Sequence, residues 1–358
     1  MSYPLLRVHL DVMECNINRI ISKFAEYGIS VWAVTKGLSC PLELARMLSE
    51  TKVTALADSR IMNIRRMKQD GIKVPFALIR IPMHSEIEDV IALADYSLVS
   101  DMGTLELMSR ECESQKKEHS VLIMADMGDL REGFWPDEAE AIAAGLKKLS
   151  PALKIAGIGV NFGCASGVLP SRESMERFVS FGEKIEAELG RKLEIFSGGA
   201  TTRSLIAIDS GLFPKRINNL RIGEGYLLGS DKSSGVTVPW LRQDTMELEA
   251  ELVEVRRKPT KPIGEIGRDA FGNVPYFEDR GNRLRGILAI GKQDVNIGGL
   301  TPLDDGVEII TASSDHLLVD IEDCQQRHKV GDILRFSLDY TAMLSSSTSP
   351  YVTKIYER

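Results

Sequence analysis

The sequence has few cysteines and histidines, and neither type is arranged as metal-binding or disulfide-rich proteins arrange them. The five cysteines are scattered along the chain: Cys15, Cys40, Cys112, Cys164 and Cys324. No CxxC pair occurs, so we expect neither a disulfide framework nor a structural zinc site. The five histidines are also dispersed and show no HxxxH spacing, and we predict no metal site.

Basic charge and long apolar runs are also missing. The formal net charge is −7, which argues against a nucleic-acid binder that relies on a basic face. No segment approaches the run of about 20 apolar residues that a membrane span needs. Arg7 and Asp11 interrupt the apolar stretch near the N-terminus, so it does not have the pattern of a signal peptide. We therefore expect a cytoplasmic protein with no membrane or nucleic-acid partner.

What the sequence does contain is a regular alternation of strand-like and helix-like segments over its first two thirds. Hydrophobic residues make up 43% of the 358 residues, enough for one large domain and a smaller one. Short β-branched runs occur at residues 8–10, 31–34, 53–56, 76–79, 96–99, 121–124, 155–160, 193–196 and 219–222. Helical patterns separate them, which is typical of parallel βαβ units. Eight repeats after a first strand favour a TIM-like (β/α)8 barrel of the α/β class, with a doubly wound sheet as the alternative.

The pattern changes near residue 230. Residues 230–236 form a short polar linker, and beyond them apolar and polar residues alternate in runs separated by Gly, Asp and Pro turns. We predict a barrel domain over residues 1–229 and a C-terminal all-β domain over 237–358, and we allow the first strand to pack with the latter. Residues 264–283 form a long polar loop, and loops of that length are often functional.

Residues at the carboxyl ends of the predicted barrel strands are the candidates for chemistry, because active sites of such barrels lie at that edge. Lys36 directly follows the second strand-like run and would point into the barrel mouth. Burial there would lower the pKa of its ammonium group, and a neutral amine forms a Schiff base with an aldehyde. The alternative is an ordinary surface lysine just beyond the strand.

The last two barrel strands are followed by small residues. Ser197, Gly198 and Gly199 follow one of them, with Thr201 and Thr202 close behind, and Gly223 follows Arg221 and Ile222 on the other. Such turns let backbone N–H groups approach a phosphate group. A lysine on an early strand together with a phosphate site on late strands suggests pyridoxal 5′-phosphate.

Further motifs carry a resemblance to a known family. The matching segments are residues 34–36, 56–60, 126–133, 197–199, 218–224, 264–267, 289–294 and 313–316. Over nearly the whole chain the sequence resembles the alanine-racemase-type pyridoxal-phosphate enzymes (fold type III), and within them the ornithine racemase group. The resemblance implies the same architecture, a barrel followed by a β domain.

The resemblance also implies roles for individual residues. Lys36 would hold the cofactor covalently, and Arg221 would face the pyridine nitrogen. A guanidinium does not hand its proton to the ring, so the cofactor would remain a weak electron sink, which favours racemisation over transamination. Arg131 would contact the phenolic oxygen of the cofactor and the carboxylate of the substrate. The remaining predicted cofactor contacts are Asn161, Ser197, Gly198, Gly199, Thr201, Thr202, Gly223, Glu224 and Tyr351.

Racemisation needs acid–base groups on both faces of the α-carbon, and Lys36 serves one of them. In the family, a tyrosine from the β domain of the partner subunit serves the other face, but Lys292 stands at its position in this chain. Lys292 is the first candidate for the second base, with His316 and Asp294 as alternatives. Ser314 and Asp315 would contact the substrate, and a group supplied in trans implies a homodimer.

These observations predict a racemase (an isomerase) that interconverts the L- and D-forms of ornithine or a related basic amino acid. A racemase of alanine or another small amino acid is one alternative. A non-catalytic protein that binds the cofactor and serves its homeostasis is another, although its relatives lack a second domain. A decarboxylase of the same fold would need an acidic group in place of Arg221. A barrel enzyme acting on sugar phosphates without this cofactor is the last alternative.

Overall fold

The structure, a computed structural model, describes residues 2–358, which divide into two compact units. One unit comprises Leu10–Gln243. The other joins the N-terminal segment up to His9 with Asp244–Arg358. The chain therefore starts in the second unit, passes through the whole of the first, and returns.

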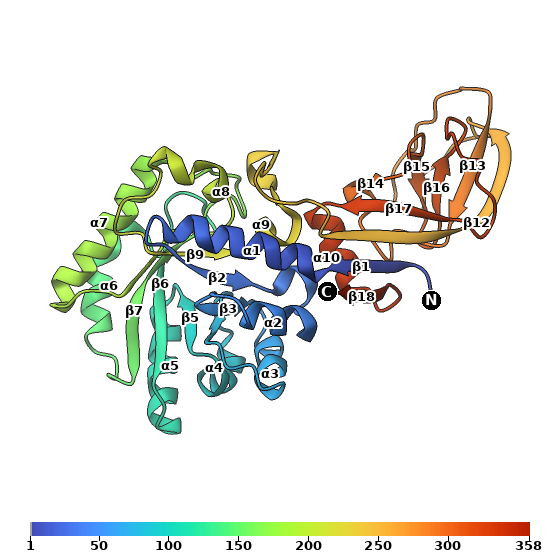
Figure 1. The fold of residues 1–358 in the computed structure, drawn as a ribbon. Coiled ribbons are helices and arrows are strands. Elements are labelled where there is room, and N and C mark those ends of the chain that lie inside the picture. The colour runs from blue at the N-terminus through green and yellow to red at the C-terminus, as the bar shows by residue number, and fades with distance from the viewer. Residues whose placement is uncertain (1) are drawn as a thin grey trace. The chain divides into compact units, whose positions relative to one another are not determined.

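The first unit is a closed parallel barrel (Figure 1). Its strands are β2 (Ser30–Val34), β3 (Ala55–Asp58), β4 (Phe76–Leu78), β5 (Tyr96–Val99), β6 (His119–Ala125), β7 (Leu153–Val160), β8 (Ile195–Ser197) and β9 (Asn219–Ile222). The pairing of β2 with β9 closes the ring, with Trp32 opposite Arg221. The prediction of a (β/α)8 barrel is confirmed, and an open doubly wound sheet is excluded.

Side chains fill the interior of the barrel. The core cluster combines large residues such as Trp32 and Met124 with alanines at positions 55, 57, 77 and 156. Trp32 and Tyr96 pack with their ring centroids 5.0 Å apart. Alternation of large and small residues lets neighbouring strands fill the same volume without overlap. The interior of the barrel is thus a packed core and not a channel.

Helices connect the strands. They are α1 (Leu10–Ala25), α2 (Leu42–Ser49), α3 (Ile61–Gln69), α4 (Ile87–Leu93), α5 (Met102–Gln115), α6 (Ala139–Leu146), α7 (Arg172–Leu189), α8 (Ser204–Ala207) and α9 (Glu224–Leu228). Short 3-10 turns lie at Lys36–Leu38, His84–Glu86, Pro136–Glu138, Ile208–Ser210 and Lys232–Ser234. In α7, Met175, Phe178 and Ile185 are buried at helical spacing. None of the helices within residues 2–358 is both long and apolar enough to cross a membrane.

The barrel unit extends further than the sequence predicts. We placed its end at residue 229, before a linker, but residues 230–243 belong to the same compact unit. They form a small hairpin of β10 (Ser230–Asp231) and β11 (Val236–Thr237). The Asn16 side chain accepts a hydrogen bond from the Arg242 N–H and donates one to the Arg242 carbonyl, at 2.9 and 2.8 Å. These bonds tie the segment to α1.

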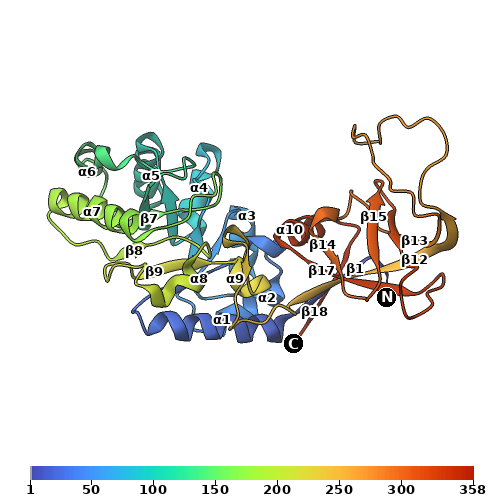
Figure 2. The same ribbon diagram turned by 90° about the horizontal axis from the view of Figure 1, so that it is seen from above.

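The second unit is built mainly of β-strands, as predicted. They are β1 (Leu5–His9), β12 (Met246–Pro259), β13 (Asn282–Leu288), β14 (Leu300–Pro302), β15 (Glu308–Ala312), β16 (Leu317–Asp320), β17 (Ile333–Leu338) and β18 (Thr353–Glu357). β1 pairs with β12 and β18, so the first strand of the chain belongs to this sheet and not to the barrel. A 3-10 turn (Ile297–Gly299) and one helix, α10 (Tyr340–Thr348), complete the unit. Between β12 and β13 the chain runs as a long loop, visible in Figure 2.

Candidate functional site

Lys36 and Arg221 come from neighbouring strands at the carboxyl-terminal edge of the barrel. Lys36 begins the 3-10 turn directly after Thr35, where β2 has ended. Arg221 lies within β9, in register with Trp32. The two strands are held further by the Tyr226 hydroxyl, which donates to the Val34 carbonyl at 2.9 Å. The fold therefore brings these two sequence-predicted residues to the same end of the barrel.

The amine of Lys36 makes no hydrogen bond or ion pair within residues 2–358. Its side chain reaches solvent through the barrel mouth. The surrounding protein nevertheless removes enough water from the amine to lower the pKa of Lys36 below its ordinary value. The Arg131 guanidinium lowers that pKa further, whereas Asp58 and Glu132 oppose the shift. An amine with a lowered pKa has a larger neutral, nucleophilic fraction near neutral pH.

Arg221 is held rigidly in the interior, with 2% of its surface exposed. Its Nη2 donates to the Val160 carbonyl at 2.7 Å and to Asn161 Oδ1 at 2.8 Å. Its Nη1 donates to the hydroxyl of Ser197. Burial lowers the pKa of Arg221 to about 10, so the guanidinium still carries its charge at neutral pH. The remaining nitrogen, Nε, has no hydrogen-bond partner in the described part of the chain.

Arg131 lies on a loop that leaves the end of β6 and folds back onto it. The Phe134 N–H donates to the Met124 carbonyl at 2.8 Å, and the Asp126 N–H donates to the Phe134 carbonyl at 3.0 Å. Gly133 makes this return possible: its φ is +141°, and a Cβ there would lie 2.3 Å from the Asp126 nitrogen. The Asp126 carboxylate accepts from the Gly128 N–H at 2.8 Å. Arg131 is thereby carried on an ordered loop.

Glu132 connects Arg131 to the interior of the barrel, although the sequence did not single it out. Its carboxylate receives two hydrogen bonds from the Arg131 guanidinium. The Asn161 amide donates to Glu132 Oε1, and Asn161 is itself bonded to Arg221. Asn161 lies just beyond β7 and is buried. The only sequence signal for Glu132 was its place beside Arg131 in the 126–133 motif.

Hydroxyl and backbone N–H groups gather after the last two barrel strands. Thr201 Oγ1 accepts long hydrogen bonds from the N–H groups of Gly223 and Gly225, at 3.4 and 3.3 Å. The hydroxyls of Thr202 and Ser233 lie 3.2 Å apart. Ser233, which we did not predict, comes from the 3-10 turn in the β10–β11 hairpin. This arrangement groups the predicted Thr201, Thr202 and Gly223 around donors suited to a phosphate group.

Other predicted residues nearby are already engaged in local contacts. The Ser197 hydroxyl is bonded to Asn219 and Arg221, which fixes Arg221. The Glu224 carboxylate accepts from the Ser230 hydroxyl and the Lys232 N–H, and burial raises its pKa. Gly198 has Ile217 against its backbone, and Gly199 has a φ of +125°. Because these side-chain oxygens are already bonded, Ser197 or Glu224 would contact the cofactor through backbone N–H or C=O groups.

A second group of predicted residues lies together in the C-terminal unit. The Lys292 N–H donates to the Ser313 carbonyl at 2.9 Å, and the Gln293 N–H donates to the Ser314 carbonyl at 3.1 Å. Gly291 permits this approach, because a Cβ there would lie 2.1 Å from the Ser314 oxygen. The exposed side chains of Ser314, Asp315 and His316 thus lie on the loop that packs against Lys292.

The long loop before β13 also contacts Lys292. The Lys292 nitrogen lies 3.8 Å from Asp269 Oδ2, and the Phe271 ring faces the same nitrogen. Asp294 accepts from the Gly291 N–H at 3.0 Å within the turn that carries Lys292. Tyr351 follows α10 and its side chain is 63% exposed. Asp269 and Phe271 were not predicted individually, although the length of their loop suggested a functional role.

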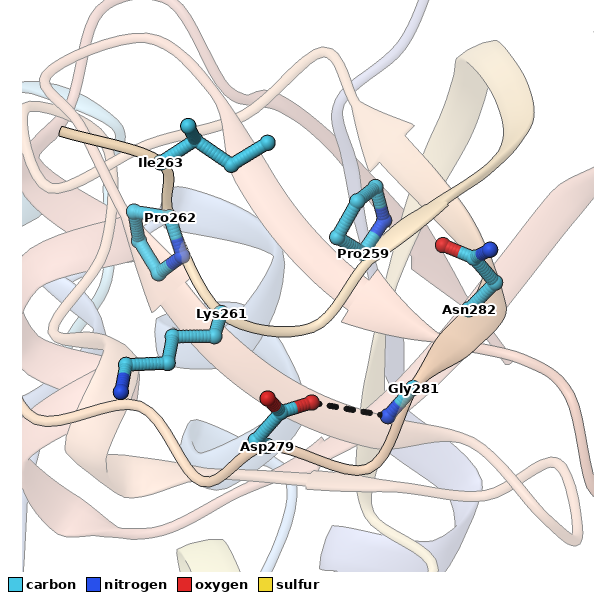
Figure 3. A pocket seen from close by; sticks show the side chains of 7 residues that line it. All are labelled: Pro259, Lys261, Pro262, Ile263, Asp279, Gly281 and Asn282. Carbon is cyan, nitrogen blue, oxygen red and sulfur yellow. Dashed lines mark hydrogen bonds between the residues drawn. The ribbon is translucent and has the colours of Figure 1, made fainter.

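Two surface hollows lie away from these groups. One, of about 270 Å3, lies beside the start of the long loop of the C-terminal unit, between Pro259, Ile263 and Asn282 (Figure 3). There the Asp279 carboxylate accepts from the Gly281 N–H at 3.1 Å. The other, of about 820 Å3, runs along the outer face of α1 beside Lys23 and Trp240. Neither hollow is lined by a residue of the two groups described above.

Comparison with known proteins identifies the family. Residues 8–229 match the model of the alanine racemase N-terminal domain. The chain belongs to the alanine racemase family. An ornithine racemase from Acetoanaerobium sticklandii is 40% identical over 98% of this chain and 99% of the relative. A lysine racemase from Thermotoga maritima is also 40% identical, over 100% of this chain and 99% of the relative.

Solved structures share the fold over nearly the full chain. The alanine racemase from Bartonella henselae with covalently bound pyridoxal phosphate has a TM-score of 0.74 and 16% identity, covering 99% of this chain and 100% of that chain. A D-threonine aldolase from Filomicrobium marinum has a TM-score of 0.73 and 17% identity, covering 97% and 88%. Because an aldolase shares the fold, the fold alone does not determine the reaction.

Proposed function

We propose that the chain is a pyridoxal 5′-phosphate-dependent racemase of basic amino acids, with ornithine and lysine as its substrate class. The observation that carries the proposal is the 40% identity, over essentially the full length, to an ornithine racemase and to a lysine racemase. The arrangement of Lys36 and Arg221 at one end of the barrel supports the same chemistry.

The residues of the barrel mouth fit the proposed cofactor. Lys36 offers an amine that is not engaged by other protein groups, and Arg221 offers an unpartnered Nε held in a fixed position. Thr201, Thr202 and the N–H groups of residues 223–225 would hold the phosphate. When bound, pyridoxal phosphate withdraws electrons from the α-carbon and makes its hydrogen acidic.

Each residue then has a defined task. Lys36, with its lowered pKa, holds or moves a proton at its Nζ on one face of the α-carbon. Arg221 would present a positive charge to the ring nitrogen and would retain its own proton. Arg131 offers its guanidinium to the substrate carboxylate.

The second face is served by Lys292 in our proposal, with His316 and Asp294 as the alternatives. Lys292 lies in the C-terminal unit, on the turn that packs against Ser314 and Asp315. The proposal places this turn at the active site of a partner subunit, so we expect a homodimer. Sedimentation that reveals a fully active monomer would contradict this part.

The test is a racemisation assay with added pyridoxal phosphate. We expect conversion of L-ornithine and L-lysine, and much slower conversion of L-alanine. Lys36→Ala should abolish both turnover and the visible absorbance of the bound cofactor. Lys154→Ala, at an exposed lysine that pairs with Glu118, serves as the control and should leave both unchanged.

The outcomes separate the alternatives. Unchanged racemisation by Lys36→Ala would reject the mechanism. A yellow protein that racemises no amino acid would favour the non-catalytic cofactor-binding protein. Preference for alanine over ornithine and lysine would retain the reaction but overturn the substrate class.

A further inference from the structure

Three cationic side chains lie at the barrel mouth, and the charge of one carboxylate affects the pKa of each of them. The cations are Lys36, Arg131 and Arg221. Glu132 lies on the loop after β6, with 17% of its side chain exposed, and pairs directly with Arg131. We propose that Glu132 is a positioning residue that fixes Arg131 and, through Asn161, Arg221. This inference rests on the proposed function for its catalytic consequences.

The contacts form an unbroken chain across the mouth. Arg131 donates to Glu132 from Nε and Nη2, a planar pairing that fixes the direction of the guanidinium. Asn161 donates to Glu132 Oε1, and its own Oδ1 accepts from Arg221 Nη2 at 2.8 Å. Asn161 can do both because an amide offers a donor and an acceptor on opposite atoms. The chain Arg131–Glu132–Asn161–Arg221 therefore couples the two predicted arginines.

The negative charge of Glu132 favours the protonated form of all three basic side chains. Burial opposes ionisation of Arg131, but the bond to Glu132 and nearby negative charge outweigh it, and the pKa of Arg131 is raised. Burial lowers the pKa of Arg221, and Glu132 counteracts that shift. Glu132 also counteracts the lowering of the Lys36 pKa. Removing this charge would leave three cations facing one another with less compensation.

The main alternative is that Glu132 binds the distal ammonium group of a basic substrate. The contacts favour the positioning role. Oε1 already accepts from Arg131 and Asn161, and Oε2 accepts from Arg131 Nε. A substrate ammonium would have to displace Arg131, the group proposed to hold the substrate carboxylate.

The test compares Glu132→Gln, Glu132→Asp and the control Asp137→Asn, an exposed carboxylate on the following segment. The first readout does not need turnover. Acetylation of Lys36 by acetic anhydride is followed against pH by peptide mass spectrometry, in the full chain without added cofactor. Because Glu132 favours the ammonium form of Lys36, Glu132→Gln should move the labelling midpoint to lower pH. Glu132→Asp keeps a carboxylate, so its labelling midpoint should lie between those of Glu132→Gln and the parent chain. Asp137→Asn should have the same midpoint as the parent chain.

The second readout is steady-state kinetics with ornithine, lysine and alanine. Positioning predicts that Glu132→Gln lowers kcat for every substrate turned over, by about tenfold or more, as expected for one charged hydrogen-bonded pair. A loss confined to the KM of ornithine and lysine, with an unchanged labelling midpoint, would overturn the inference. So would variants that match the parent chain in both readouts.

The experiments can reject the proposed function and the positioning role of Glu132 independently of each other. If the parent chain racemises no amino acid, the proposed function fails, but the labelling of Lys36 still decides whether Glu132 governs the charge of the mouth.

Discussion

The side-chain nitrogen of Lys292 lies 3.9 Å from the centre of the Phe271 ring. A cation over an aromatic face is attracted by the ring, and the carboxylate of Asp269 adds to this attraction at 3.8 Å. Asp269 is itself fixed, because it accepts from the N–H groups of Phe271 and Asn273 at 2.9 and 2.8 Å. The tip of the long loop, residues 268–273, thus orients the proposed second base.

Replacement of Lys292 should stop proton transfer on one face only. In Lys292→Ala, the enantiomer that Lys36 deprotonates should still exchange its α-proton with solvent. Product of the opposite configuration should form slower by a factor on the order of 10²–10⁴. The measurement is deuterium incorporation in D2O by NMR, starting from each enantiomer, with Lys261→Ala as the control. Equal loss of exchange from both enantiomers would argue against Lys292, and His316→Ala would then be examined in the same way.

Arg221→Lys should lower the stability of the folded chain. Lysine keeps the charge but cannot reproduce the separate bonds to Val160 and Asn161, and at a buried site the lost hydrogen bonds cost about 2 kcal/mol or more. Urea unfolding measures this loss against Arg172→Lys, an exposed arginine paired with Glu176. A variant as stable as this control would show that the buried network contributes little.

Gly133→Ala should disorder the loop that carries Arg131. The added Cβ would meet the Asp126 nitrogen at 2.3 Å and the Ala125 carbonyl carbon at 2.4 Å. Gly167→Ala is the matched control, because Gly167 also has a positive φ, +75°, but no atom within 4 Å of the added Cβ. Both variants place a side chain at positive φ, so the comparison removes part of the backbone cost, and the overlap adds to the larger cost at Gly133. We expect a lower kcat and a higher KM for the amino acid only in Gly133→Ala.

His119 should make the stability of the barrel depend on pH. Its ring is buried between the Ser97 hydroxyl and the Ala94 carbonyl, at 2.8 and 3.1 Å. Burial lowers the pKa of His119 from 6.5 to about 4 in the folded state. Between these values the unfolded chain binds more protons than the folded chain, so stability is full above pH 6.5 and falls as the pH decreases towards 4. The loss amounts to about 3 kcal/mol.

Urea unfolding at pH 7 and pH 4.5 measures this dependence. His119→Gln removes the titrating group and should be less stable at pH 7, yet lose less between the two pH values than the parent chain. If the parent chain and His119→Gln lost the same amount of stability between pH 7 and pH 4.5, titratable groups other than His119 would cause the pH dependence.

The local pattern of the sequence predicted parallel βαβ units and placed Lys36 and Arg221 at or near strand ends, whereas the pairing of β2 with β9 decided for a closed barrel over a doubly wound sheet. Alternating β-branched runs and amphipathic helices specify parallel βαβ units, because each segment must bury its apolar side. Residues at the ends of such strands then meet at one edge, whatever the details of the loops. The same reasoning found the alternating strands of the C-terminal unit.

Helix α10 illustrates what the pattern could not reveal. The segment Tyr340–Thr348 is rich in serine and threonine, which are weak helix formers, and it shows no strong amphipathic periodicity. It is helical because Asp339 caps the N-H groups of Thr341 and Ala342, and because Ala342, Met343 and Ser346 are buried by the sheet unit. In this segment, capping and tertiary packing outweigh the weak intrinsic helix propensity of serine and threonine.

By itself, the sequence determined the order of strands and helices in the barrel and which charged residues follow its strands, since both depend on neighbours along the chain. The sequence left open whether the first strand packs with the C-terminal domain, and only the tertiary structure decided that β1 pairs with β12 and β18. It also decided that Glu132 and Asn161, 29 positions apart, join Arg131 to Arg221. Both outcomes depend on contacts between distant segments, whose hydrogen-bonding groups find partners only after the chain has folded.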